Sequence, residues 1–401
     1  MDGFLPDMLG LLVLAMVVAI VARRLALPYT VGLAVTGGLV ASFSADKGVA
    51  LTPGLIYDVI LPPLLFEGAL KLDWTALRRD LAPVMTLTVL GVIISAGVVA
   101  GGVVVGLGWP VEAGTVFGVL IAATDPISVI ATFKDNRMSN RLSLFVEAES
   151  LFNDGVAAVL YAIVLFAVGG HATGFVEGGE AMLRIGGGGI AIGLGCGLIA
   201  MLAVGRSGDH LVETTITVIT AYGAFLLAEN MRASGVLATV AAGLLMGNFQ
   251  PGEGQLGRLF CVRGNAFVHE FWDFAAFIAN SIVFILIGVS SARLALDGVT
   301  LLVIGIAIIL VLAGRALSVY PVCLLFRRTR WALPLRDQHV IWWSGLRGAL
   351  GLALALSLPD GLARKDQIVT ATFGVVLFSI IVQGGTMPVM LRRLKLLPTA
   401  G

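Results

Sequence analysis

Charged side chains are scarce in this sequence. Asp, Glu, Lys and Arg together make up 13% of its 401 residues, whereas hydrophobic residues make up 58%. A soluble domain carries about 25% charge, so a large part of the usual solvated surface is missing. This composition excludes a soluble enzyme, a nucleic-acid-binding protein and a secreted scaffold. It favours a helical protein that crosses the bilayer many times.

Cysteine and histidine are also rare. The three cysteines, Cys196, Cys261 and Cys323, are far apart and odd in number, which argues against a disulfide framework or a thiolate metal site. The four histidines have neither HxxE nor HExxH spacing. Glycine is frequent, but it follows no G-X-Y period, which excludes collagen. We expect no resident cofactor and no enzymatic activity.

Long apolar runs, in contrast, are abundant. A helix of about 20 apolar residues crosses the hydrocarbon core of a bilayer. An all-α polytopic fold of about 13 transmembrane helices is therefore predicted. The spans are expected at roughly 5–22, 29–43, 53–70, 82–107, 113–133, 145–169, 183–204, 211–229, 234–247, 267–291, 299–326, 338–357 and 367–391. The first span lacks a basic leader and should be retained rather than cleaved.

The distribution of Lys and Arg predicts the orientation. Loops on one side of the membrane hold 18 of these residues and the opposite side holds 6, while Arg315 and Arg347 lie inside spans. By the positive-inside rule the N-terminus is outside and the C-terminus is cytoplasmic. The expected location is a cell membrane, namely the inner membrane of a bacterium. The short loops and tail lead us to expect no appended soluble domain.

Carboxylates outnumber arginines in the spans. Ionisable groups at membrane depth are costly and usually mark an ion path or a proton relay. Any one of them could instead be a buried structural partner, but together they predict an interior that attracts cations. The candidates are Asp58, Glu67, Asp125, Glu147, Glu149 and Asp154, with Glu229, Glu270 and Asp273 nearer the ends of spans.

Two spans have the pattern of a broken helix. Pro126 lacks a backbone donor and clashes with the preceding turn, so the fifth span should break around Thr124–Asp125. In the twelfth span, Gly345 and Gly348 flank Arg347. Interrupted helices at matching places in two halves indicate an inverted-repeat transporter with ion sites at the breaks. The halves would be spans 1–6 and 8–13, and an ordinary proline kink remains the alternative for the fifth.

The sixth span offers oxygen ligands on one face. Residues four apart are neighbours on a helix, so Ser150 lies near Asp154 and Glu149 near Asn153. A hydroxyl and a carboxylate are hard ligands for a monovalent cation. The alternative, a helix cap, is disfavoured because apolar residues also precede this segment. For Glu67, at the end of the proline-kinked third span, a structural and a functional role agree equally with the sequence.

Five segments taken together resemble NhaP/NHE-type sodium/proton antiporters of the cation/proton antiporter 1 family. The likeness covers nearly the whole membrane domain. It implies a core transport domain, 82–169 and 299–391, that moves against a dimer-forming interface domain, 1–81 and 211–291, with 183–204 as a linking helix. The segments, in chain order, are LPPLLFEGAL, ATDPISVIATF, FVEAESLFNDGVAAVLY, GRALSVYPV and WSGLRGALGLALAL.

The resemblance also implies roles for individual residues. It implies a Na⁺ site around one carboxylate, an ion pair that holds the core together, and an arginine where the broken helices cross. The Na⁺ ligands would be Asp154, Ser150, Thr124 (through its carbonyl) and Glu67, supported by Asp125 and Asn153; the ion pair would be Glu149 with Arg315, and the crossing arginine Arg347.

The mechanism follows from sharing one site. One carboxylate cannot hold a proton and Na⁺ together, so competition at Asp154 would couple their movements. The neutral Asn153 beside it suggests one proton per cation and electroneutral exchange. We predict an elevator-like Na⁺/H⁺ antiporter, with Li⁺ as a further substrate, that acts as a homodimer in a lipid bilayer without nucleic acid. The alternatives are a K⁺/H⁺ antiporter, a cation channel and a sodium-coupled symporter of an organic anion.

Overall fold

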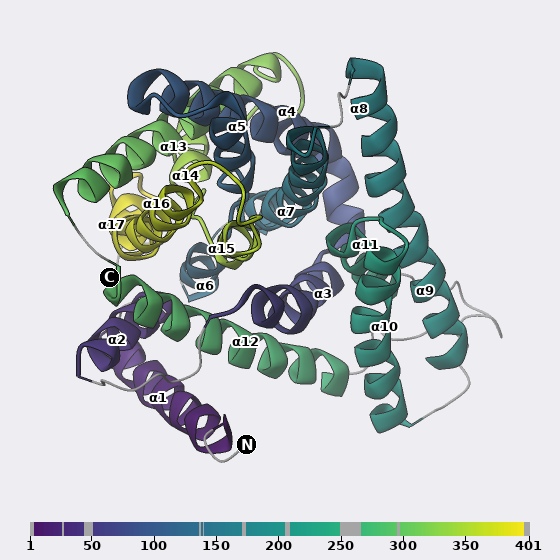
Figure 1. Ribbon diagram of the computed structural model, residues 1–401. Coiled ribbons are helices and arrows are strands. Elements are labelled where there is room, and N and C mark those ends of the chain that lie inside the picture. Colours follow the sequence, from purple (N-terminus) through teal and green to yellow (C-terminus); the bar gives the residue numbers. More distant parts are fainter. Residues whose placement is uncertain are drawn as a thin grey trace. The chain divides into compact units, whose positions relative to one another are not determined.

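The computed structural model describes residues 4–25, 28–43, 51–135, 138, 140–170, 174–204, 209–248, 266–294 and 297–396. Every regular element in these ranges is helical, which confirms the predicted all-α class (Figure 1). Seven of the described helices are long and apolar enough to cross a membrane, and four shorter ones are apolar as well. Each of the thirteen predicted spans has a helical counterpart. Cys261 lies outside the described residues.

The helices form two compact units. The first unit comprises 1–56, 82–153 and 280–401. It contains most of α4 (Trp74–Leu107), the start of α7 (Asn140–Val168) and the end of α12 (Ala266–Ala292). Its other helices are α1 (Phe4–Leu25), α2 (Tyr29–Phe43), α5 (Val111–Leu120), α6 (Ile127–Asp135), α13 (Gly298–Leu325), α14 (Leu335–Trp343), α15 (Ala349–Leu356), α16 (Lys365–Phe378), the π-helical η4 (Ser379–Gly384) and α17 (Gly385–Arg393).

Within the first unit, helices far apart in the sequence pack together. α13 packs on α16, and α15 packs on both α5 and α16. Gly37 of α2 allows a close approach, because a Cβ added there would lie 2.9 Å from the carbonyl carbon of Ile285 in α12. Small residues let helix backbones approach in this way inside a membrane. The unit is therefore held by backbone-close packing as well as by apolar side chains.

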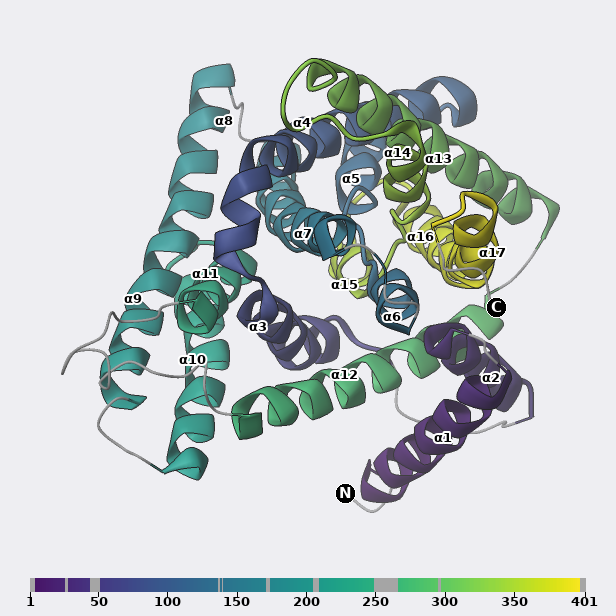
Figure 2. The same cartoon turned by 180° about the vertical axis from the view of Figure 1, so that it is seen from behind.

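The second unit comprises 57–81 and 154–279. Its centre is α11 (Gly235–Asn248), which packs against α3, α9 and α10 (Figure 2). A Cβ at Gly193 of α9 would lie 2.8 Å from the Cα of Ala238 in α11, so these two backbones are nearly in contact. The unit also contains most of η1 (Leu55–Ile60, π-helical), and its other helices are α3 (Leu61–Lys71), α8 (Phe175–Met182), η2 (Leu183–Gly187, π-helical), α9 (Gly188–Val204) and α10 (His210–Asn230).

Some helix bounds differ from the predicted spans. The fourth span was predicted from 82, but α4 begins at Trp74. Hydropathy misses its first two turns, which contain Arg78, Arg79 and Asp80. The helical segment before the seventh span, α8, was not predicted because its two glutamates and two glycines give it no apolar signal. At the third span, two prolines occupy the first turn of α3, where a missing backbone donor costs least.

Candidate functional site

Both predicted breaks are present, and a backbone hydrogen bond joins them. α5 ends at Leu120 and α6 begins at Ile127, while α14 ends at Trp343 and α15 begins at Ala349. The Asp125 backbone N–H donates to the carbonyl of Leu346 at 2.8 Å. Breaking a helix leaves carbonyl and N–H groups without their intrahelical partners. At the crossing, where the two breaks meet, such freed carbonyl and N–H groups are available to bind an ion or a side chain.

Arg347 lies at this crossing with its side chain buried. Its Nη1 donates to the carbonyl oxygens of Ala122 and Ala123, at 3.1 and 3.2 Å, just past the end of α5. Its backbone N–H donates to Ser379 Oγ at 3.0 Å. A positive charge is favourable near the C-terminal end of a helix, where the partial charge is negative. The guanidinium therefore compensates the carbonyls that the first break exposes.

Thr124 connects the first break to α7. Ser150 Oγ donates to the Thr124 carbonyl at 2.5 Å, and Asn153 Nδ2 donates to Thr124 Oγ1 at 3.1 Å. All three side chains are at most 5% exposed. Asn153 Oδ1 is buried and has no hydrogen-bond partner among the described residues. A buried acceptor without a donor costs free energy, and a cation would satisfy it.

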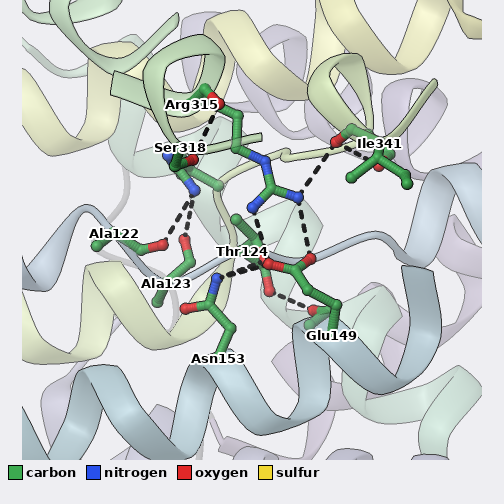
Figure 3. Close-up of polar contacts among 11 residues, drawn as sticks. Ala122, Ala123, Thr124, Glu149, Asn153, Arg315, Ser318 and Ile341 are labelled. Carbon is green, nitrogen blue, oxygen red and sulfur yellow. Dashed lines mark hydrogen bonds and ion pairs between the residues drawn. The ribbon is translucent and has the colours of Figure 1, made fainter. Parts of the chain in front are cut away.

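Glu149 and Arg315, the predicted ion pair, lie beside these groups. Arg315 donates through Nη1 and Nη2 to the two carboxylate oxygens of Glu149, at 2.8 and 3.0 Å, and Figure 3 shows the guanidinium between Glu149 and Ile341. Nη2 also donates to the Ile341 carbonyl at 3.1 Å, next to the second break. Asn153 Nδ2 reaches Glu149 Oε1 at 3.3 Å. The pair thus links α7, α13 and α14 within the first unit.

The two aspartates take different places. Asp125 Oδ1 accepts a hydrogen bond from the Ile127 backbone N–H at 3.1 Å, so this carboxylate caps the start of α6. Asp154 follows Asn153 in α7, one turn beyond Ser150, and is partly buried. The position of Asp154 on the Ser150 face follows from the spacing of an α-helix.

Glu67 forms an ion pair with Lys71 that was not predicted from the sequence. Its Oε1 accepts from Lys71 Nζ, and the same ammonium also donates to Oδ1 of Asp273 in α12. The i,i+4 spacing of Glu67 and Lys71 was a local signal for this pair. The part played by Asp273, 202 residues away, had no such signal. Ser379, which binds the backbone of Arg347, was missed for the same reason.

A cavity of about 810 Å³ lies in the second unit. Its wall includes Ala158, Ala162 and Phe166 of α7, and Ala158 lies one turn beyond Asp154, next to it on the helix surface. Its polar lining includes Tyr57, Glu177, Glu180, Arg184, Glu229, Arg232 and Ser234. Within the described ranges, no group of three or more His, Cys, Asp or Glu side chains could hold a metal ion.

Comparison with known proteins decides the family. The family model described as "Sodium/hydrogen exchanger, transmembrane" matches residues 11–393. The chain belongs to the sodium/hydrogen exchanger family. The chain is 36% identical to the Na⁺/H⁺ antiporter ApNhaP of Aphanothece halophytica over 394 residues, and the alignment covers 92% of this chain and 70% of ApNhaP. The resemblance to NhaP-type antiporters is thereby confirmed.

Two further relatives agree with this assignment. The low-affinity Na⁺/H⁺ antiporter NhaS1 of Synechocystis is 36% identical over 389 residues, covering 92% of this chain and 70% of NhaS1. The solved structure of the sodium proton antiporter MjNhaP1 from Methanocaldococcus jannaschii matches with a TM-score of 0.75 at 19% identity, covering 97% of this chain and 98% of that one. Because the identity is below 25%, this match shows only that the two proteins share a fold, which is that of a polytopic membrane protein.

Proposed function

We propose that this protein is a secondary antiporter that exchanges Na⁺ for H⁺ across a cell membrane. The observation that supports this most is the polar contact between the break after α5 and α7. There a freed carbonyl (Thr124), a hydroxyl (Ser150) and an unsatisfied amide oxygen (Asn153) lie together in a buried setting. Hard oxygen ligands of this kind suit a small monovalent cation. The named activities of ApNhaP and NhaS1 support the same function.

Asp154 is the carboxylate that we propose for the exchange itself. It follows Ser150 by one turn of α7, and Ala158, one further turn along the same face, lines the cavity of the second unit. That cavity supports access of water and ions to this face. We propose Thr124 and Glu67 as further ligands, with Asp125 and Asn153 in support. Glu149, Arg315 and Arg347 hold the breaks in place without binding the cargo.

Coupling follows from competition at that carboxylate. A proton and Na⁺ exclude each other at Asp154, and reorientation of only the occupied site makes the exchange obligatory. Since Asn153 is neutral, one proton moves per cation and the exchange is electroneutral. We propose that 82–169 and 299–391 move as the transport core against 1–81 and 211–291 in a homodimer. From the distribution of Lys and Arg, we propose that the N-terminus is outside and the C-terminus is in the cytoplasm.

Proton movement in proteoliposomes tests this function. Purified protein is reconstituted with a fluorescent pH probe inside, and Na⁺, Li⁺ and K⁺ pulses are applied in turn to vesicles without a pH gradient. Saturable alkalinisation of the vesicle interior on Na⁺ addition, absent from empty vesicles, is the expected result. A response to K⁺ alone indicates a K⁺/H⁺ antiporter. Single-channel current in planar bilayers contradicts the antiporter proposal and favours a channel.

A further inference from the structure

Lys71, Glu67 and Asp273 form a cluster in which two carboxylates surround one ammonium, as they would surround a bound cation. Its ammonium donates to Glu67 in the same helix and to Asp273 in α12, all within the second unit. The Lys71 and Glu67 side chains are only 23% and 20% exposed, whereas the Asp273 side chain is 57% exposed. Two carboxylates thus share one partly buried monovalent cation that belongs to the protein itself.

The chemistry of this ammonium is close to that of the proposed cargo. A lysine ammonium is a compact point charge on a flexible stem, with three donors that rotate freely. Carboxylate oxygens that accept from it are the same oxygens that would coordinate Na⁺.

The two contacts of Lys71 differ in strength and persistence. Glu67 is four residues earlier in α3, so its contact with Lys71 persists wherever this helix goes. Asp273 belongs to another helix and is far more exposed, so water and salt screen its contact more strongly. Asp273 therefore draws the ammonium away from Glu67 only in part, and its charge sets how firmly Lys71 holds Glu67.

We propose that Lys71 is a tethered cation that competes with the transported cation for Glu67, and that Asp273 weakens this competition by sharing the ammonium. This inference rests on the proposed role of Glu67 as a cation ligand. Lys71 acts through Glu67 and is a positioning residue. Its charge lowers the apparent affinity for the cargo, and releasing Glu67 to the cargo requires the ammonium to move toward Asp273.

The half-saturating Na⁺ concentration for proton movement in proteoliposomes tests the proposal. In Lys71→Gln the competitor is gone, so this concentration should fall about fivefold, the effect of a partly exposed ion pair, with little change in maximal rate. In Asp273→Asn the ammonium stays on Glu67, so the same concentration should rise. Lys71→Arg keeps the charge and should stay near the wild-type value.

Arg78→Gln is the matched control. It removes the same charge seven residues along, from an exposed side chain that forms no ion pair with the residues that the structure describes. It should leave the half-saturating concentration unchanged, which separates local competition from a general change in surface charge. The double variant Glu67→Gln/Lys71→Gln should equal Glu67→Gln alone, because Lys71 acts only through Glu67.

The outcomes separate this inference from the proposed function. If Glu67→Gln does not change the half-saturating Na⁺ concentration, the ligand role of Glu67 fails and the competitor role fails with it. If Glu67→Gln raises this concentration but Lys71→Gln lowers only the maximal rate or the melting temperature, Lys71 is a structural salt-bridge partner and the inference is overturned. A fall in Lys71→Gln together with a rise in Asp273→Asn supports it.

Discussion

Arg315 donates a hydrogen bond to each carboxylate oxygen of Glu149, with Nη1–Oε1 at 2.8 Å and Nη2–Oε2 at 3.0 Å. The two side chains are 5% and 2% exposed, so this bidentate pair is buried. The Arg315 backbone carbonyl in turn accepts from Ser318 Oγ at 2.9 Å. Removing one partner of such a pair leaves the other charge buried and unpaired, which is far more costly than the pair is worth.

The first prediction concerns the stability of this pair. Arg315→Ala and Glu149→Gln should each lower the free energy of unfolding by about 3–5 kcal/mol, because each leaves an unpaired buried group. The charge-neutral double variant Glu149→Gln/Arg315→Met should recover part of the loss. Thermal melting in detergent measures the effect. Arg336→Ala is the control, because the Arg336 side chain is exposed and pairs with Asp337 at 3.7 Å. Normal melting of Arg315→Ala would refute the prediction.

The second prediction separates binding from folding. Asp154→Asn should abolish Na⁺-driven proton movement and leave the melting temperature and the oligomeric state unchanged. The amide keeps the shape of the side chain but cannot exchange a proton for a cation. Glu112→Gln, an exposed carboxylate in the first turn of α5, serves as the control and should retain transport. Substantial exchange by purified Asp154→Asn protein rules out the assignment.

The third prediction concerns the crossing of the broken helices. A Cβ at Gly348 would lie 2.6 Å from Cγ of Asp125. Gly348→Ala should therefore destabilise the protein by about 1–3 kcal/mol through overpacking and slow transport. Gly97 in α4 has no heavy atom within 4 Å of its built Cβ, so Gly97→Ala should be neutral or slightly stabilising. Equal melting temperatures for the two variants would show that the crossing adapts.

The fourth prediction is the dependence of cation affinity on pH. If Na⁺ and a proton share Asp154, the half-saturating Na⁺ concentration should rise about tenfold per pH unit on the acid side and level off on the alkaline side. Linkage makes the effect reciprocal, so adding Na⁺ must release protons from the protein. Initial rates at several pH values and proton release in unbuffered detergent solution measure the two arms. An affinity that is independent of pH contradicts the shared site.

The fifth prediction concerns charge movement. With one proton exchanged per Na⁺, an imposed membrane potential should leave the rate of exchange unchanged. Proteoliposomes clamped with K⁺ and valinomycin test this once K⁺ has been excluded as a substrate. A rate that depends steeply on potential excludes electroneutral exchange but leaves the shared site intact, since the two claims are independent.

Local sequence signals predicted the parts of this fold that local chemistry determines. Pro126 and the glycines around Arg347 predicted the two breaks, because a missing donor or Cβ acts at its own position. Apolar runs predicted thirteen spans but placed the start of α4 too late, because hydropathy does not detect polar helical turns. Helical spacing predicted that Ser150 and Asp154 share a face of α7, but only the resemblance to a family associated them with Thr124.

Long-range pairing was beyond the reach of such signals. Nothing in the sequence near Lys71 indicates Asp273, and nothing near Arg347 indicates Ser379, because these contacts depend on how distant helices pack. The pairing of Glu149 with Arg315 was expected only from the resemblance to a family. The lack of a hydrogen-bond donor for Asn153 Oδ1 among the described residues could not be predicted either, since it depends on the rotamers of neighbouring side chains.

The hydrogen bond from Asp125 N–H to the Leu346 carbonyl has a consequence for amide exchange with solvent deuterium. The segments 121–126 and 344–348 are not helical, and loops of that kind normally exchange their amide protons quickly. Here the amides of Asp125 and Arg347 are both bonded, one to the second break and one to Ser379. Exchange at the Asp125 amide requires a local opening that separates the two breaks, and exchange at the Arg347 amide requires one that separates the second break from Ser379. These two amides should therefore take up deuterium slowly, although both lie outside the helices.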